Sequence, residues 1–557
     1  MANSITVSVK SAIKKLWQLI NLERKEVSYI YFFAALAGLI QLSLPLGIQA
    51  IIGLLFGGML SASLIVLICF VVLGVMLAGI LQVMQMRVSE RIQQRIFARL
   101  TFAYAYRIPK IDLLSVDNYY LPELVNRFFD TASLQKGLSK LLLDIPAASI
   151  QILFGLTLLS FYHPVFIVFG VVLVAVVVII FYLSSPKGLS SSIEESDYKY
   201  EVAHWLEEIS RAIKTFKFSQ TTGLHLKKTD DLTAGYLDAR NTHFNVLVLQ
   251  YRVLIAFKVT ITAAMLIIGS LLLIRQQINL GQFVAAEIII IGTLSSVEKL
   301  IVSLETVYDV MTSIEKLNKV LQKPHDNESS KLNTTDSEID GPLSLTVSDL
   351  SFAYQASKPI INNLSFAVSP GEKICVRGKE GSGKTTLLRL LAGLYSHYQG
   401  TIVANGLPLQ NIPTAQWRSK VAVYFSREEL FSGTFWENLT MGNQDINISD
   451  VKEVCEIVGL ADFISSREQG YQATLDPLGQ RLSDTVVQKI LIARCLLARP
   501  ALLLLENGWQ SIEEPYRNII MDKLMNDRSF SVIAISDDSE LTRRCDKVID
   551  LTTNERA

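Results

Sequence analysis

Six long apolar runs set the pattern of the N-terminal part of the chain. A helix needs about 20 apolar residues to cross the roughly 30 Å hydrocarbon layer of a bilayer. Each run is long enough to do so, and the pattern therefore predicts six membrane-spanning helices. The runs cover residues 27–55, 62–84, 141–161, 165–184, 246–274 and 281–304.

Basic residues are concentrated in two of the connections between these runs. Six arginines and lysines lie between Arg87 and Lys110, and five lie between Arg211 and Lys228. The connections near Gly57, His163 and Arg275 are short and carry few of them. The positive-inside bias then places both long loops and both termini in the cytoplasm. The long loops are helical in pattern, so the second to fifth spans are expected to extend beyond the bilayer.

Residues 1–26 combine basic side chains with apolar ones at roughly helical spacing. This pattern predicts an interfacial amphipathic helix, and a plain soluble helix is the alternative. No small-residue cleavage site follows a short apolar core, which argues against a signal peptide. The residues concerned are Lys10, Lys14, Lys15, Arg24 and Lys25, with Val7, Ile13, Leu16, Trp17 and Ile20 between them.

Several charged residues fall within or beside the predicted spans. A charge facing lipid is costly, so these side chains are expected to face the bundle interior, a water-filled path or one another. The alternative for the last three is that they are merely solvated on a cytoplasmic extension of the sixth helix. Glu287 is the deepest candidate. The set is Lys258, Glu287, Glu298, Lys299 and Glu305.

A polar segment, residues 323–342, separates the apolar part from a chain of a different character. It lacks apolar periodicity and is interpreted as a linker. Strand-like runs then alternate with helical segments up to residue 557, which predicts an α/β domain with a largely parallel, buried sheet. These runs are Leu343–Val347, Ser365–Val368, Lys373–Val376, Thr401–Ala404, Val421–Phe425, Ala501–Leu505 and Val532–Ser536. The expected plan is residues 1–26, 27–322, 323–342 and 343–557.

One stretch of the second part carries recognisable chemistry. It follows an apolar run and opens a leucine-rich segment, so it lies where a strand turns into a helix, as a P-loop requires. Its glycines let backbone N–H groups face a phosphate, its lysine can reach the β- and γ-phosphates, and its threonine can ligate Mg²⁺. A glycine-rich turn without a ligand is the alternative, and the flanks argue against it. The residues are Gly378, Lys379, Glu380, Gly381, Ser382, Gly383, Lys384 and Thr385, with Thr386 next to them.

Composition agrees with a membrane protein. The 557 residues are 50% hydrophobic with a mean hydropathy of +0.34, which is too apolar for an ordinary soluble protein. Lys plus Arg equals Asp plus Glu at 52 each, so nothing points to nucleic acid. Five scattered cysteines form no C-x-x-C pair, which argues against a disulfide framework and a zinc site and favours a cytosolic soluble part.

Six spans followed by a P-loop domain resemble an ABC exporter half-transporter. Tyr354 matches the aromatic residue that stacks on adenine in that family, and the segment of Leu482, Ser483, Asp484 and Thr485 matches the signature. The resemblance implies an all-α transmembrane domain and a cytosolic α/β nucleotide-binding domain in the plasma (inner) membrane. It also implies ATP and Mg²⁺ as cofactors and a second ABC chain as partner.

The membrane half looks most like the peptide and protein exporters of type 1 secretion, notably at Gly281-Gln282-Phe283. This resemblance implies a peptide or protein as cargo and, by analogy, a periplasmic adaptor. The peptidase domain that precedes the spans in such exporters is expected to be absent here.

The chain departs from the family at the positions that take part in ATP hydrolysis. Where the family's Walker B motif ends in Asp-Glu, this chain has Glu506-Asn507. The family's switch histidine is replaced by Asp537. Glu506 can still direct a negative charge toward Mg²⁺, but the amide of Asn507 cannot accept a proton from water. A positioned carboxylate base contributes roughly 10²- to 10⁴-fold in rate. The Q-loop glutamine is replaced by Ser426, which is too short to reach the same ion.

The signature and D-loop are altered as well. Asp484 replaces a signature glycine, and Glu513 replaces the D-loop aspartate. Two unit charges about 5 Å apart at an effective dielectric near 20 repel by about 3 kcal/mol, so Asp484 would oppose a γ-phosphate. We therefore expect a transporter subunit that binds ATP and hydrolyses it weakly by itself. The alternatives are an ATP-binding regulatory scaffold that transports nothing and a conventional homodimeric ATPase exporter.

Overall fold

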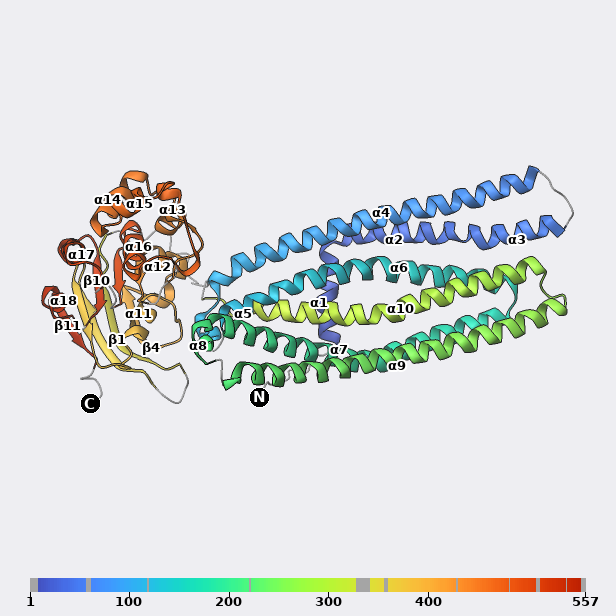
Figure 1. Cartoon of the computed structure of the whole chain (residues 1–557), viewed down its shortest axis with the longest axis horizontal. Coiled ribbons are helices and arrows are strands. Elements are labelled where there is room, and N and C mark those ends of the chain that lie inside the picture. Colours follow the sequence, from blue (N-terminus) through green and yellow to red (C-terminus); the bar gives the residue numbers. More distant parts are fainter. Residues whose placement is uncertain are drawn as a thin grey trace. The chain divides into compact units, whose positions relative to one another are not determined.

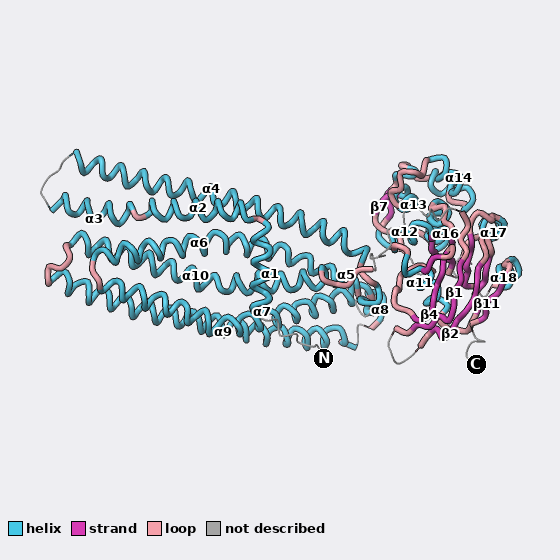
Figure 2. The backbone as a smooth tube through the Cα atoms, turned by 180° about the vertical axis from the view of Figure 1, so that it is seen from behind, coloured by secondary structure: helices cyan, strands magenta, loops and turns pink. Residues whose placement is uncertain are grey.

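The chain folds into two compact units in a computed structural model (Figures 1 and 2). The first comprises Met1–Pro109 and Tyr119–Lys323, and the second comprises Lys110–Asn118 and Pro324–Ala557. Each unit has its own hydrophobic core. The structure describes residues 9–56, 62–117, 120–219, 222–326, 341–354, 359–426, 429–479, 481–506, 511–536 and 538–551. Most of the predicted linker therefore lies outside the described residues.

The first unit is built of helices. Six helical stretches among the described residues are long and apolar enough to cross a membrane, which confirms the six predicted spans. These stretches are Arg24–Phe56, Ala62–Lys110, Leu121–Tyr162, Val165–Arg211, Leu224–Ile274 and Leu280–Leu321. The helices are α1 (Val9–Leu22), α2 (Arg24–Gln41), α3 (Ser43–Phe56), α4 (Ala62–Arg107), α5 (Leu121–Asn126), α6 (Asp130–Tyr162), α7 (Val165–Arg211), α8 (Ile213–Phe218), α9 (Leu224–Ile274) and α10 (Leu280–Leu321).

Several of these helices are much longer than a bilayer is thick. α4, α7 and α9 contain 46, 47 and 51 residues. At 1.5 Å per residue they reach about 70 Å or more, against a hydrocarbon layer of roughly 30 Å. The predicted extension of the second, fourth and fifth spans beyond the membrane follows from these lengths.

The spans pack in pairs along their length. α10 packs chiefly against α6, α7 against α9, and α2 against α4. Lys258 of α9 forms an ion pair of 2.7 Å with Glu298 of α10, and the Tyr251 hydroxyl donates to the same carboxylate at 3.2 Å. Glu298 is therefore paired across two helices, and its interpretation as a merely solvated side chain is wrong.

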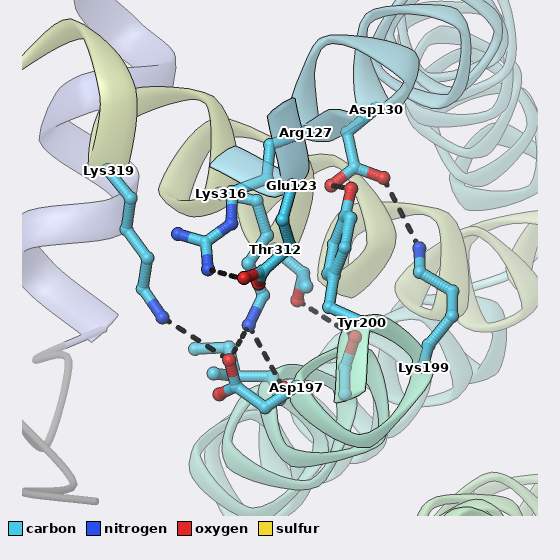
Figure 3. Close-up of polar contacts among 11 residues, drawn as sticks. Glu123, Arg127, Asp130, Asp197, Lys199, Tyr200, Thr312, Lys316 and Lys319 are labelled. Atoms are coloured by element: carbon cyan, nitrogen blue, oxygen red, sulfur yellow. Dashed lines mark hydrogen bonds and ion pairs between the residues drawn. The ribbon is translucent and has the colours of Figure 1, made fainter. Parts of the chain in front are cut away.

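Polar contacts also join α6, α7 and α10 (Figure 3). Lys316 of α10 is fully buried and pairs with Asp197 of α7, which Lys319 approaches to 3.3 Å. On α6, Asp130 accepts a hydrogen bond of 2.7 Å from the Tyr200 hydroxyl. These contacts fix three helices relative to one another where the apolar periodicity of the spans has ended.

The N-terminal helix α1 has an apolar face that the unit does not cover completely. Trp17 is 68% exposed and Ile13 is also exposed, while Lys15 forms an ion pair of 3.0 Å with Glu315 of α10. The helix is thus tied to the bundle on one side. Its position at a membrane surface stays a prediction, and Val7 lies outside the described residues.

The second unit contains two main sheets. The core sheet has the order β11-β3-β10-β9-β6 and is entirely parallel, as predicted. An antiparallel sheet, β2-β1-β4-β5, was not foreseen as a separate layer. The strands are β1 (Leu345–Phe352), β2 (Ile361–Val368), β3 (Lys373–Arg377), β4 (Gln399–Ala404), β5 (Leu407–Pro408), β6 (Val421–Tyr424), β7 (Gly433–Thr434), β8 (Thr474–Leu475), β9 (Leu502–Leu505), β10 (Ser531–Ile535) and β11 (Lys547–Asp550).

Helices of the second unit cover these sheets. α11 buries Leu387, Leu388, Leu390 and Leu391 in a core that also contains residues of both sheets. The apolar side chains that follow the P-loop therefore anchor it to the body of the domain. The helices are α11 (Lys384–Leu391), α12 (Thr414–Lys420), α13 (Phe435–Thr440), α14 (Ile448–Val458), α15 (Ala461–Ser465), α16 (Asp484–Leu497), α17 (Glu514–Asn526) and α18 (Ser539–Arg544).

Part of the first long loop folds with the second unit. Ile111 pairs with His325 in an isolated β-bridge, and the Asp112 amide donates to the Pro324 carbonyl at 3.0 Å. Leu113 and Leu114 pack against the core of that unit. The chain between the second and third spans thus contributes directly to the domain that carries the P-loop.

Candidate nucleotide-binding site

The candidate site lies at the carboxyl edge of the parallel sheet. β9 pairs with β6 so that Leu505 faces Tyr424, and β10 pairs with β3 so that Ile535 faces Val376. The residues that follow these strands consequently meet at one edge, which is where open α/β sheets bind their ligands. The P-loop follows β3, Glu506 follows β9 and Ser426 comes shortly after β6.

The P-loop has the backbone form of an anion-binding turn. Gly381 and Gly383 have φ of +81° and +88°, a region that residues with a Cβ rarely adopt. A Cβ on Gly383 would also lie 3.1 Å from the Ile360 carbonyl oxygen. The loop leads directly into the N-terminus of α11, where backbone N–H groups and the helix dipole favour negative charge.

The side chains of the P-loop are available to a phosphate. The Lys384 ammonium donates to the carbonyls of Gly378 and Lys379, the latter at 3.1 Å. These are contacts that a phosphate oxygen can replace. The Ser382 hydroxyl is buried without a hydrogen-bond partner among the described residues. Lys379 and Glu380 are exposed at the rim.

Three oxygen-bearing side chains converge next to the P-loop. The Thr385 hydroxyl donates to Oε1 of Glu506 at 2.5 Å. Oε2 of the same carboxylate accepts from the Ser426 amide at 3.0 Å and from the Ser426 hydroxyl at 3.1 Å. A carboxylate and two hydroxyls are hard oxygen donors of the kind that Mg²⁺ prefers, so the set fits the ion that accompanies a nucleotide.

Tyr354 lies beside the start of α11. Its hydroxyl is 3.2 Å from the Thr386 hydroxyl and accepts from Arg389 at 3.5 Å. Its ring meets Phe352 and Tyr395 edge to face, with centroids 5.1 and 5.5 Å away. The ring therefore lies beside the helix that follows the P-loop, and its role of stacking on a base stays a prediction.

The signature segment begins a helix. Ser483 is the N-cap of α16 and its hydroxyl accepts from the Val486 amide at 3.4 Å, while Asp484 is the first helical residue and is exposed. The Thr485 hydroxyl donates to the Ser511 carbonyl at 3.0 Å. Leu482 is partly buried against the domain core. The exposed carboxylate of Asp484 can therefore face a ligand that approaches the N-terminus of α16.

Glu513, at the D-loop position, has a partner that the sequence did not reveal. The Lys489 ammonium lies 2.8 Å from its carboxylate, and this hydrogen bond holds the pKa of Glu513 below its usual range. Lys489 is buried and also donates to the Gly459 carbonyl at 3.2 Å. The lysine lies on α16 and Glu513 is the N-cap of α17, so no spacing along the chain signalled this contact.

Two further residues of the site were missed. Arg389 and Tyr395 contact Tyr354, and burial raises the pKa of Tyr395 to about 12. Arg389 lies one helical turn after Thr385, which places it on the same side of α11. The predicted catalytic positions Asn507 and Asp537 lie outside the described residues.

Two family models match the chain. The model described as ABC transporter transmembrane region matches residues 27–296, and the model described as ABC transporter matches residues 361–508. The second range includes the P-loop, Ser426, the signature segment and Glu506. Such a domain implies ATP binding.

Individual relatives match parts of the chain. A probable ABC transporter ATP-binding/permease protein of Haemophilus influenzae is 28% identical over 51% of this chain and 51% of its own length. The leukotoxin export ATP-binding protein LtxB of Aggregatibacter actinomycetemcomitans is 28% identical over 48% of this chain and 38% of its own. The chain thus spans about half or less of these relatives' lengths.

A solved structure shares the fold. A bacterial Atm1-family ABC exporter with ATP bound superposes with a TM-score of 0.84 and covers 95% of this chain and 94% of that one. The two sequences are 18% identical, so the likeness concerns the fold alone. It confirms the predicted fold class, six apolar helices followed by an α/β domain.

Proposed function

The chain belongs to the ABC transporters, since it joins their transmembrane region to their nucleotide-binding domain, and from this premise we propose that it is an exporter subunit that binds ATP with Mg²⁺ but hydrolyses it poorly by itself. Its spans cross the membrane and its nucleotide-binding domain faces the cytoplasm. In this proposal, residues 1–26 form an interfacial helix, 27–322 the transmembrane domain, 323–342 a linker and 343–557 the nucleotide-binding domain.

The proposal rests on a contrast between the residues that bind phosphate and the residues that would activate water in the same site. The P-loop keeps its glycine conformations and its lysine, and Thr385 keeps a carboxylate partner in Glu506. The groups that would act on water differ, because Asn507 has no basic carboxylate and Asp537 has no imidazole. A phosphate-binding loop with these neighbours supports ATP binding more than ATP hydrolysis.

Each residue of the site has a role in this proposal. The P-loop amides and Lys384 hold the β- and γ-phosphates, and Tyr354 stacks on the base. Thr385 and Glu506 hold Mg²⁺, which supplies charge neutralisation at the phosphates when it is bound. Asn507 orients water without taking its proton. Asp537 places a negative charge where a donor is needed, which opposes cleavage.

Sandwiching of the nucleotide between two chains is the step that moves the spans. In such a dimer the helix end at Ser483 would face the γ-phosphate held by the other chain, and the exposed Asp484 would repel it. A homodimer would therefore combine a weak base with an unfavourable signature in both sites. In a heterodimer with an intact partner, each site would keep one of these two defects.

A partner chain with intact motifs is therefore part of the proposal. The similarity to a protein named as exporting leukotoxin supports a peptide or protein as cargo. By the same analogy a periplasmic adaptor completes the complex. The segment Lys110–Asn118, which folds with the nucleotide-binding unit, is suited to transmit domain closure to the second and third spans.

An ATPase measurement on the purified chain tests this function. The chain alone is expected to turn over slowly, and both Asn507→Glu and the addition of an intact ABC partner are expected to raise the rate. Robust turnover of the chain alone that Lys384→Ala abolishes would instead identify a conventional homodimeric ATPase. Normal cargo movement by the partner complex with Lys384→Ala in this chain would show that its nucleotide is dispensable.

A further inference from the structure

A polar cavity of about 420 Å³ lies between α6, α7 and α10 of the helical unit. Figure 3 shows two residues of its wall, Asp130 of α6 and Lys199 of α7, which approach each other to 3.3 Å. All of its lining residues lie beyond the apolar runs of the three helices, on the cytoplasmic side. Its volume is in the range of small-molecule sites.

Some charges of this cavity are paired, and three are not. Glu195 of α7 forms an ion pair of 3.0 Å with Arg240 of α9. Lys136 and Lys140 of α6 and Asp309 of α10 are exposed, and none of them forms an ion pair or hydrogen bond within the described part of the chain. A ligand that satisfies these three side chains has an anionic group for the two ammoniums and a cationic group for the carboxylate.

Lys136 and Asp309 lie at the same level of the helix bundle. α6 and α10 approach closely beside them, since a Cβ added to Gly137 would overlap the side chain of Val310. Each of the two charged residues is five residues away from the apolar run of its helix, and Lys140 directly precedes the run of α6. Five helical residues span about 7.5 Å. The polar layer of a bilayer is about 5–8 Å thick on each side, so these side chains reach the head groups of the cytoplasmic leaflet.

The inside of the cavity is suited to a hydrogen-bonding occupant. Ser196 of α7 is buried, and its hydroxyl has no hydrogen-bond partner among the described residues. Thr312 and Ser313 of α10 add further hydroxyls to the wall. Leaving a buried hydroxyl without a partner is costly. The cavity therefore favours water or a polar group over an acyl chain.

We propose that this cavity binds the head group of an aminophospholipid, with the phosphate at Lys136 and Lys140 and the ammonium at Asp309. The order of the charges fits, because the phosphate of such a lipid lies nearer the hydrocarbon layer than its ammonium does, and Lys140 is the residue of the three that is nearest to an apolar run. Basic pockets between membrane helices on the cytoplasmic side bind head groups in this way. The lipid is a ligand besides nucleotide and cargo, so the inference goes beyond the proposed function.

Native mass spectrometry of the full chain in detergent, titrated with lipid and without ATP, measures this binding. Dioleoyl phosphatidylethanolamine is expected to bind at least about fivefold more tightly than dioleoyl phosphatidylglycerol, which has the same chains and phosphate but no ammonium. Changing both lysines, Lys136→Gln with Lys140→Gln, is expected to weaken binding of both lipids by about 25-fold, since each basic residue near a membrane surface contributes about fivefold. The changed side chains are exposed, so these variants are expected to fold.

A change of the carboxylate tests the selectivity for the ammonium. The isosteric Asp309→Asn is expected to weaken binding of phosphatidylethanolamine by about fivefold and not to weaken binding of phosphatidylglycerol, so that the preference disappears. Lys227→Gln and Asp230→Asn make the same chemical changes at exposed residues of α9 that do not line the cavity. These matched controls are expected to leave both affinities unchanged.

Three results would overturn the inference. Equal affinity of the unmodified chain for the two lipids would show that no ammonium is recognised. A full preference retained by Asp309→Asn would show that this carboxylate does not select the lipid. Binding of soluble phosphoethanolamine as tightly as the lipid would show that the cavity takes a soluble zwitterion instead of a head group. Since ATP is absent from the assay, each of these results leaves the proposed function intact, and failure of ATP binding leaves this inference intact.

Discussion

The ring of Tyr354 is held by Phe352, Tyr395 and Arg389. An aromatic ring stacked on a base contributes roughly 1–3 kcal/mol by alanine substitution. Tyr354→Ala is therefore expected to weaken ATP binding about five- to 150-fold. Tyr354→Phe keeps the ring and loses only the hydroxyl contacts with Thr386 and Arg389, so it should bind nearly as well as the unmodified chain. Equal affinities of all three proteins, measured by titration calorimetry, would contradict stacking.

Lys373 on β3 is buried, and its ammonium donates to the carbonyls of Asp527 and Phe530 at 2.7 Å each. Burial lowers the pKa of Lys373 to about 8 from 10.5. Between these values the unfolded chain binds more protons than the folded chain, so stability is expected to rise as the pH increases from about 8 to about 10.5. The gain from this group is about 3 kcal/mol.

Denaturant unfolding of the second unit within the full chain at pH 8, 9 and 10 measures this effect. Lys373→Met removes the titrating group, and the difference between the two proteins isolates its contribution. A constant difference across this pH range would refute the assignment.

Motif residues could be recognised from sequence, whereas their mutual contacts could not. The spacing of Gly378 to Thr385 identifies a P-loop because the chemistry of phosphate binding fixes it. The contact of Glu506 with Ser426 depends on β6 lying beside β9, a pairing between strands far apart in the chain. The contact of Lys489 with Glu513 could not be predicted either, because the two residues lie on different elements.

Elements were predictable where one periodicity or a continuous apolar run defines them. The spans and the buried parallel strands β3, β9 and β10 belong to this class. The two-residue strands β5, β7 and β8 are too short to show a pattern, and β11 is mostly exposed and was missed. The separate antiparallel sheet depends on which strands pair, which apolar runs alone do not specify.

The ion pair between α7 and α10 can be tested by removing either partner separately. Lys316 is fully buried, whereas its partner Asp197 is half exposed and is also approached by Lys319. Asp197→Ala leaves a buried cation without its carboxylate and is expected to cost about 3–5 kcal/mol. Lys316→Met removes the buried charge, keeps most of the volume and should cost clearly less.

Thermal unfolding of the two variants in the same detergent compares these costs. The double variant, with neither charge, should resemble Lys316→Met. If Lys316→Met lowers the unfolding temperature more than Asp197→Ala does, the ion pair contributes more to stability than the buried charge costs. This result would contradict the expectation.

On the scale of the whole molecule, a proposed homodimer would bring Asn507 and Asp484 together in each composite site. Asn507 of one chain would act on the nucleotide that Asp484 of the other chain approaches. Asn507→Glu supplies a base worth roughly 10²- to 10⁴-fold, and Asp484→Gly removes a repulsion of about 3 kcal/mol, or about 150-fold. The double variant is expected to hydrolyse ATP much faster than either single variant, in a steady-state ATPase assay. A double variant no faster than Asn507→Glu would show that Asp484 does not face the nucleotide.

In the proposed function, this chain binds ATP at an intact P-loop and hydrolyses it poorly. Its most direct test measures binding and turnover on one preparation of the full chain with Mg²⁺. We expect saturable ATP binding below millimolar concentration that Lys384→Ala abolishes, together with turnover that Asn507→Glu increases at least tenfold. Absence of binding at millimolar ATP, or rapid turnover that depends on Lys384 and does not respond to Asn507→Glu, would contradict it.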